Sequence, residues 1–311
     1  MFDYGILGYF YGALSGAFVA AIIGWWYLRE NIIWSGWQNK WWSILIRFGA
    51  PLAPAGLIQY VLNSSDRWFI SHFSGQENLG IYAIGAKFAM LVSLIVITFR
   101  RAWWPIAMDA IHSSEGPKLF REIARLYLGL GSAGVVLVTA TSPFLVKCFT
   151  TQTYYMAYPI IGILSWSSIF YGFYLIITGG IWKARKTAWP TILMGISAAL
   201  NLLFNSWLVP SYGGIGAALA TSISFAIWII LTLSISNKYW KINYNYSIMA
   251  IQIAIGVCST YLILFLYMNN YGSLGPLLIC CFAVVLLLGS SIPINQSHKL
   301  FRTYILTKDL N

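Results

Sequence analysis

The chain has 311 residues, of which 59% are hydrophobic and only 9% charged, and its mean hydropathy is +0.71. These values lie far from those of water-soluble globular domains and indicate an integral membrane protein. The net charge of +11 is then explained by topology and by an anionic membrane surface, and it does not require a nucleic-acid partner.

Nine apolar stretches are long enough to cross a bilayer core, which takes about 17 to 25 residues. No ten-residue segments alternate between apolar and polar residues, so we expect an all-α bundle rather than a β-barrel. The predicted spans cover residues 5–27, 48–73, 79–99, 126–147, 156–178, 188–209, 214–236, 247–268 and 274–294.

Charge placement predicts the orientation of these spans. All but three of the 19 Lys and Arg residues fall on one side, which the positive-inside rule places in the cytoplasm together with the tail 295–311. The exceptions are Arg67, Lys87 and Lys147, and the last stands at a span end from which it can reach the surface.

The first span, residues 5–27, then begins outside the cytoplasm. The preceding residues, MFDYG, lack the cationic segment of a signal peptide. We therefore expect this span to be an internal helix of a longer protein, with further spans upstream.

The second span carries polar residues at helical spacing: Gln59, Asn63, and then Asp66 or Arg67. In a bilayer such residues tend to face a cavity or another helix. Pro51 and Pro54 near the start of this span break local helical bonding and suggest either a hinge or a static kink.

The third span carries Lys87, which lies as far after the SGQEN turn as Asp66 lies before it. Antiparallel helices joined by this turn are expected to hold the two side chains at similar depth. One interpretation is a charged cavity lining; the other is a buried ion cluster with Arg67 that only fixes helix packing.

Asn201 and Asn205, one helical turn apart in a later span, can line the same cavity or hydrogen-bond between helices. The four cysteines show neither metal-ligand spacing nor a disulfide framework. Phosphate-binding glycine loops, HExxH and nucleophile elbows are absent from the sequence, and the outer connections are short, so an enzyme is not expected.

Four stretches of the sequence stand out in their order along the chain: PLAPAGLIQYVLNSSDRWFISHFSGQENLGIYAIGAKFA (51–89), AWWP (102–105), GIWKARKT (180–187) and NLLFNSWLVPSYGGIGAALAT (201–221). Together they resemble the Wzx-type polysaccharide flippases, which share a superfamily with multidrug and toxic compound extruders and lipid II flippases. The resemblance covers residues 1–240 continuously and the last two spans more loosely. The final stretch is shared across the whole superfamily.

The resemblance implies two six-helix lobes that operate by alternating access. Residues 1–27 would be the last helix of an incomplete N-terminal lobe, 28–47 a cytoplasmic inter-lobe linker, 48–236 the C-terminal lobe and 247–294 two appended helices. The five helices that begin the family's fold are absent from this chain.

The resemblance also implies a function: flipping of undecaprenyl-diphosphate-linked oligosaccharides across the bacterial inner membrane for O-antigen or capsule synthesis. Arg67 and Lys87 would meet the diphosphate, with Asp66 holding or releasing one of them. No cofactor is expected beyond a coupling ion, H⁺ or Na⁺. Besides membrane lipid, a polysaccharide polymerase and a chain-length regulator are the implied partners. The alternatives are a cation-coupled multidrug antiporter and an inactive fragment.

Overall fold

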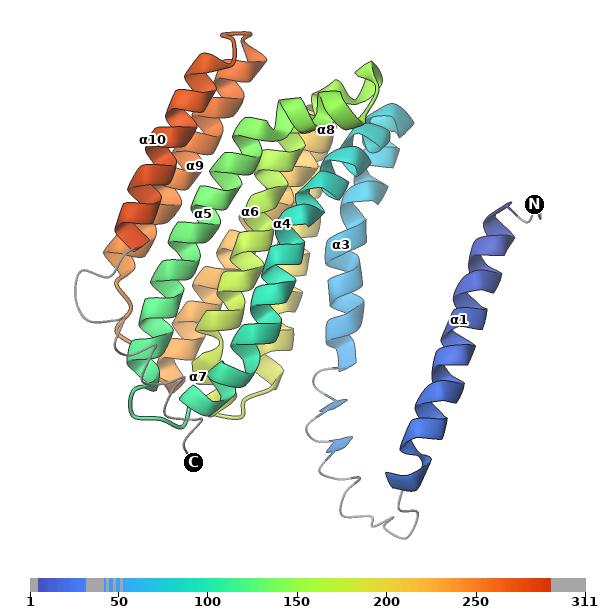
Figure 1. The fold of residues 1–311 in the computed structure, drawn as a ribbon, viewed down its shortest axis with the longest axis vertical. Helices are drawn as coiled ribbons and strands as arrows, with labels where there is room; N and C mark the ends of the chain where they lie inside the picture. Colours follow the sequence, from blue (N-terminus) through green and yellow to red (C-terminus); the bar gives the residue numbers. More distant parts are fainter. Residues whose placement is uncertain (1–4, 32–41, 43–44, 47–48, 51–52, 292–311) are drawn as a thin grey trace. The chain divides into compact units, whose positions relative to one another are not determined.

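The structure, a computed structural model, describes residues 5–31, 42, 45–46, 49–50 and 53–291 (Figure 1). It divides into two compact units, residues 1–50 and 51–311. The first unit contains α1 (Gly5–Leu28), an apolar helix of 24 residues, followed by the short η1 (Arg29–Asn31). Most side chains of α1 are exposed, as suits a helix whose neighbours are lipid or other helices.

The second unit is a helical bundle, and no strand occurs among the described residues. The predicted fold class, a polytopic helical membrane protein, is confirmed. Its elements are α3 (Ala53–Phe73), α4 (Gly75–Ala110), α5 (Gly116–Phe149), η4 (Gln152–Ala157), α6 (Tyr158–Ile177), α7 (Gly179–Lys183), α8 (Ala188–Tyr239), α9 (Tyr246–Met268) and α10 (Leu274–Ser291).

The long element α8 is two antiparallel halves joined at Gly213, whose φ of 53° and ψ of −132° are not helical. Hydrogen bonds between the halves show that the chain doubles back: the Ser197 hydroxyl donates to the Ser224 carbonyl at 3.1 Å. The two predicted spans at 188–209 and 214–236 therefore correspond to two separate passes.

Seven described helical stretches are long and apolar enough to cross a membrane, with α8 counted once. α3 is not among them, although it runs beside helices that are. Its sequence contains Gln59, Asn63, Asp66 and Arg67, which lower its hydropathy. A helix this polar requires partners inside the protein.

Two helices extend further than the sequence predicts. α4 has 36 residues and α5 has 34, so at 1.5 Å per residue each is about 50 Å long and exceeds a bilayer core of about 30 Å. The cationic segment 100–125, expected as a loop, consists mainly of helix ends that project past the apolar part of each span. Only residues 111–115 form the connection.

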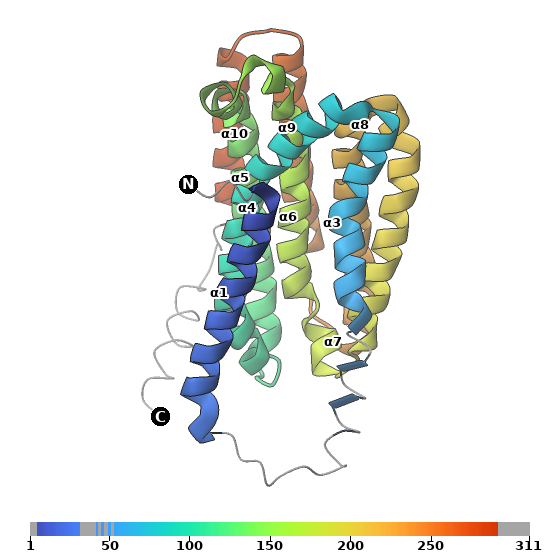
Figure 2. The same ribbon diagram turned by 90° about the vertical axis from the view of Figure 1, so that its right-hand side faces the viewer.

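α6 lies at the centre of the bundle and packs against α4, α5 and α8 (Figures 1 and 2). α3 packs mainly along α8, on one side of the bundle. α9 and α10 pack on each other and on α5, on the other side. The main core contains large aromatic side chains, among them Trp103, Phe120, Trp166, Phe173 and Trp228.

Hydrogen bonds fasten α9 and α10 to the helices beside them. Arg125 Nε donates to the Ser290 carbonyl at 2.7 Å near the end of α10, and the Tyr267 hydroxyl donates to the Ala140 carbonyl at 2.8 Å near the end of α9. The division into a six-helix lobe and two appended helices stays a prediction, and most of the predicted linker 28–47 lies outside the described residues.

Candidate functional site

Asp66, in the C-terminal half of α3, is only 3% exposed and its carboxylate accepts three hydrogen bonds. The Tyr82 hydroxyl donates to Oδ2 at 2.6 Å and the Thr221 hydroxyl donates to the same oxygen at 2.8 Å. Asn205 Nδ2 donates to Oδ1 at 2.8 Å. These donors come from α4 and from both halves of α8, so one carboxylate joins three other helical segments.

The turn between α3 and α4 sets the first of these contacts. α3 ends at Phe73 and α4 begins at Gly75, whose positive φ of 83° allows the chain to reverse within two residues. Asp66 lies eight residues before Ser74 and Tyr82 lies eight residues after it. The two side chains therefore face each other at the same depth.

The break in α8 likewise determines which residues of its two halves face each other. Asn201 and Thr221 are equally distant from residue 211, next to Gly213, and Asn201 Nδ2 donates to Thr221 Oγ1 at 3.1 Å. The two turns also lie together, because the Ser74 hydroxyl donates to the Val209 carbonyl at 3.4 Å.

A second layer of hydrogen bonds surrounds the carboxylate. Asn201 Oδ1 accepts from the Ser65 hydroxyl and from Asn205 Nδ2, both at 3.0 Å. Asn201 and Asn205 are fully buried, and the Oδ1 atom of Asn205 has no hydrogen-bond partner. We call this group the Asp66 cluster; its members are Ser65, Asp66, Tyr82, Asn201, Asn205 and Thr221.

The donor set of the Asp66 cluster suits a hard cation. Carboxylate, amide and hydroxyl oxygens are the ligands that such ions prefer, and Asn205 Oδ1 is a buried acceptor with no other use. A carboxylate can equally take up a proton. In the described part of the chain no three His, Cys, Asp or Glu residues gather as a transition metal would need.

The predicted neighbours of Asp66 lie elsewhere. Arg67 and Lys87 are both exposed, and among the described residues neither forms an ion pair with Asp66. The expected Asp66–Lys87 pair is wrong because α4 already begins at Gly75, so the turn is centred at residue 74 rather than at 76 or 77. Arg67 follows Asp66 by about 100° around the helix and leaves the buried face.

The other residues that the sequence analysis singled out in the second span are not members of the Asp66 cluster. Gln59 is half-buried on α3, and the side chain of Asn63 lies outside the described part of the chain. Pro51 also lies outside the described residues. Pro54 stands in the first turn of α3, where a missing N–H breaks no helical bond, so it begins the helix rather than interrupting it. A hinge at these prolines stays a prediction.

Sequence reasoning missed three members of the Asp66 cluster, namely Ser65, Tyr82 and Thr221. The signal for Tyr82 and Thr221 was their distance from the two glycine turns, once those turns are placed at Gly75 and Gly213. Ser65 gives no such signal, since a serine beside an aspartate is common at any surface.

Comparison with known protein families identifies one that matches this chain. Residues 51–207, half of the chain, match the MatE family. No curated protein sequence matches. Among solved structures, a lipid II flippase, MurJ, in an inward closed conformation has 17% sequence identity and a TM-score of 0.39 over 68% of this chain and 51% of its own. The chain thus spans about half the length of that protein.

The MatE match begins at the start of α3, continues through α4–α7 and ends in the first half of α8, so it includes Asp66, Tyr82, Asn201 and Asn205. The described helices supply the multi-pass architecture that such a transporter family needs. This chain belongs to the MatE family of membrane transporters.

Proposed function

We propose that this chain takes part in carrying a lipid-linked oligosaccharide, bearing an anionic diphosphate, across the bacterial inner membrane. The undecaprenyl-diphosphate-linked repeat units of O-antigen or capsule are the substrates of this class. Transport needs no covalent chemistry from the protein, only a path for the polar head while the prenyl tail stays in lipid.

The distribution of charge on α3 and α4 carries this proposal. Asp66 is withdrawn into a hydrogen-bonded cluster, and it is the only acid away from the helix ends in the described spans. Arg67 and Lys87 are exposed, so the charges available to a ligand are cationic. Moving a diphosphate through a low-dielectric region without counter-charge would cost many kcal/mol, and two cations reduce that cost.

Arg67 and Lys87 differ in what they offer the diphosphate. The planar guanidinium of Arg67 can donate two parallel hydrogen bonds to one phosphate, whereas the ammonium of Lys87 acts as a point charge. Their helices leave the same tight turn, so a movement of α3 against α4 would change the spacing of the two charges. Such a change would bind the head in one state and release it in the other.

The Asp66 cluster supplies the second part of the proposal, a site for the coupling ion. Na⁺ would be held by the Asp66 carboxylate with the amide oxygens of Asn201 and Asn205, and H⁺ would be held on the carboxylate itself. Because the cluster joins α3, α4 and both halves of α8, an ion bound there would favour one packing of these helices over another.

A cation-coupled multidrug antiporter of the same superfamily is the alternative. A drug-cation site needs an exposed acid, and the described spans offer Asp66 only in its buried, hydrogen-bonded position. The charge on α3 and α4 therefore favours the anionic substrate.

Complementation tests the proposed role of the two cations. In a strain that lacks its own polysaccharide flippase, Arg67→Ala or Lys87→Ala should abolish the surface polysaccharide that this protein restores, while protein abundance stays normal. Lys87→Arg should be tolerated better than Lys87→Ala because it keeps the charge. Lys238→Ala, which removes an exposed charge at the end of α8, is the matched control. Undiminished transport in both alanine variants at positions 67 and 87 would rule this role out.

A further inference from the structure

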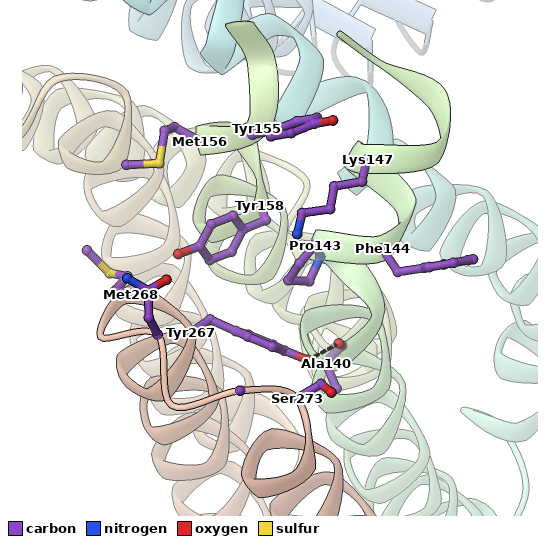
Figure 3. Close-up of a pocket in the computed structure, with 12 residues that line it drawn as sticks. Ala140, Pro143, Phe144, Lys147, Tyr155, Met156, Tyr158, Tyr267, Met268 and Ser273 are labelled. Carbon is purple, nitrogen blue, oxygen red and sulfur yellow. Dashed lines mark hydrogen bonds between the residues drawn. The ribbon is translucent and has the colours of Figure 1, made fainter. Parts of the chain in front are cut away.

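A pocket outside the Asp66 cluster lies where the ends of α5 and α9 meet the start of α6 (Figure 3). Its volume is about 670 Å³, within the range of about 300–1,000 Å³ typical of ligand pockets. Its walls are mainly apolar and aromatic. The lining comes from the end of α5, from η4 and the start of α6, and from the end of α9 with the loop that follows it.

Lys147 is the only charged residue in this lining. It is exposed near the end of α5 and has no acidic partner within ion-pair distance in the described part of the chain. Its ammonium lies 6.0 Å from the centre of the Tyr155 ring, and Figure 3 shows it pointing toward Pro143 and Tyr158. The pocket therefore has an unneutralised positive charge.

The pocket also extends along α5 away from that charge. At its other end the Tyr267 hydroxyl donates to the Ala140 carbonyl at 2.8 Å, drawn as a dashed line in Figure 3, and Ser273 lies beside this hydrogen bond. Ala140 precedes Lys147 by two helical turns, which is about 10 Å along α5. The Tyr158 and Tyr267 rings meet edge to face at 6.1 Å between centroids and line this part of the wall.

We propose that this pocket binds the headgroup of an anionic phospholipid from the surrounding leaflet. The phosphate would meet Lys147 at one end of the pocket, and the Ser273 hydroxyl beside Ala140 would be available to a polar group of the headgroup at the other end. The acyl chains would follow the apolar side chains of Phe144 and Met156, which are 69% and 63% exposed. A tyrosine-rich wall at the end of a span suits the headgroup level of a bilayer.

Two observations favour a lipid over a soluble phosphate. The charge is a single lysine, whereas the rest of the wall is mainly apolar and aromatic and would gain little from a small hydrophilic anion. The pocket also lies between helices that face the bilayer and is formed partly by the loop between α9 and α10. A bound lipid would therefore hold α9 and α10 against α5, independently of what the transporter carries.

Native mass spectrometry of the purified chain, titrated with phosphatidylglycerol in detergent micelles, tests this site. Lys147→Gln should weaken phosphatidylglycerol binding about fivefold, the effect of one lysine near an anionic surface. Ser273→Trp, which fills the end of the pocket beside Ala140 from an exposed position, should weaken phosphatidylglycerol binding without changing any charge. Lys147→Arg and Lys238→Gln, a charge lost at the end of α8, should bind as the wild type does.

The lipid source is tested by two further ligands. Phosphatidylcholine should bind more weakly than phosphatidylglycerol and be insensitive to Lys147→Gln, and excess glycerol phosphate should not compete. Equal losses in Lys147→Gln and Lys238→Gln would mean non-specific attraction and overturn the proposal. So would unchanged binding in Ser273→Trp, or displacement of the lipid by glycerol phosphate.

Discussion

Asp66 shows how one buried carboxylate can hold several membrane helices together. Its donors Tyr82, Asn205 and Thr221 stand on three helical segments, and their hydrogen bonds offset part of the cost of burying a charge. Removal of the acceptor would leave the donors buried without a partner. Each unsatisfied group of this kind costs about 1–3 kcal/mol.

Two substitutions of Asp66 separate structure from ion binding. Asp66→Ala should lower the thermal unfolding temperature of the purified protein, because it removes the acceptor. Asp66→Asn keeps an acceptor and similar volume, and the Tyr82 and Thr221 hydroxyls can rotate to accept from its amide, so it should unfold near the wild-type temperature. If the cluster binds Na⁺, adding Na⁺ should raise the wild-type temperature but not that of Asp66→Asn.

The control for this experiment is Thr141→Ala, an exposed position on α5 whose hydroxyl bonds only within its own helix. It should change neither the unfolding temperature nor its response to Na⁺. An Asp66→Asn protein stabilised by Na⁺ as strongly as the wild type would contradict the ion site.

At the scale of elements, two tight reversals determine the site. Gly75 and Gly213 both have positive φ, and the segments that they join run antiparallel with polar residues at matching depth. Sequence reasoning predicts which spans carry polar residues, because Asn201 and Asn205 must find partners in an apolar region. The sequence cannot predict which residues become these partners. If the centre of the turn between α3 and α4 is placed two or three residues too late, Lys87 rather than Tyr82 is expected opposite Asp66. SGQEN looks like a loop, whereas Gln76, Glu77 and Asn78 are helical.

The break at Gly213 can be tested by substitution. Gly213→Ala should destabilise the protein by about 1–3 kcal/mol, because an L-residue rarely adopts φ 53° with ψ −132°. The loss should appear in thermal unfolding and in the distance between labels on the two halves of α8. Gly134→Ala is the matched control, since Gly134 is helical and a Cβ there meets nothing within 4 Å. If Gly213→Ala and Gly134→Ala were equally stable, a side chain at position 213 would cause no strain and the prediction would be wrong.

At the scale of the whole molecule, the sequence predicts the number and approximate extent of the described spans, because apolar length is a strong signal. The sequence underestimates the lengths of α4 and α5, because their charged ends continue as helix beyond the apolar region. The connections at opposite ends of the second unit agree with the predicted alternation of sides. The α3–α4 turn meets the break in α8, and both Gly116 and Lys183 lie against Trp240.

Single cysteines in a background without the four native ones test the predicted orientation. Labels at Gln76 and Ser211 should react with a membrane-impermeant maleimide on intact cells, whereas labels at Ser114 and Ala184 should react only after permeabilisation. The reverse pattern would invert the orientation proposed from the Lys and Arg residues.

The central claim is the proposal that this chain takes an anionic lipid-linked head rather than a drug cation. The measurement is binding to the purified chain of an undecaprenyl-diphosphate-linked oligosaccharide, compared with tetraphenylphosphonium. We predict that the diphosphate lipid binds, that Arg67→Gln with Lys87→Gln weakens its binding at least tenfold, about 1.4 kcal/mol, and that Lys238→Gln does not. Preferential binding of tetraphenylphosphonium, or diphosphate binding that is equal in the double variant and the wild type, would contradict the account.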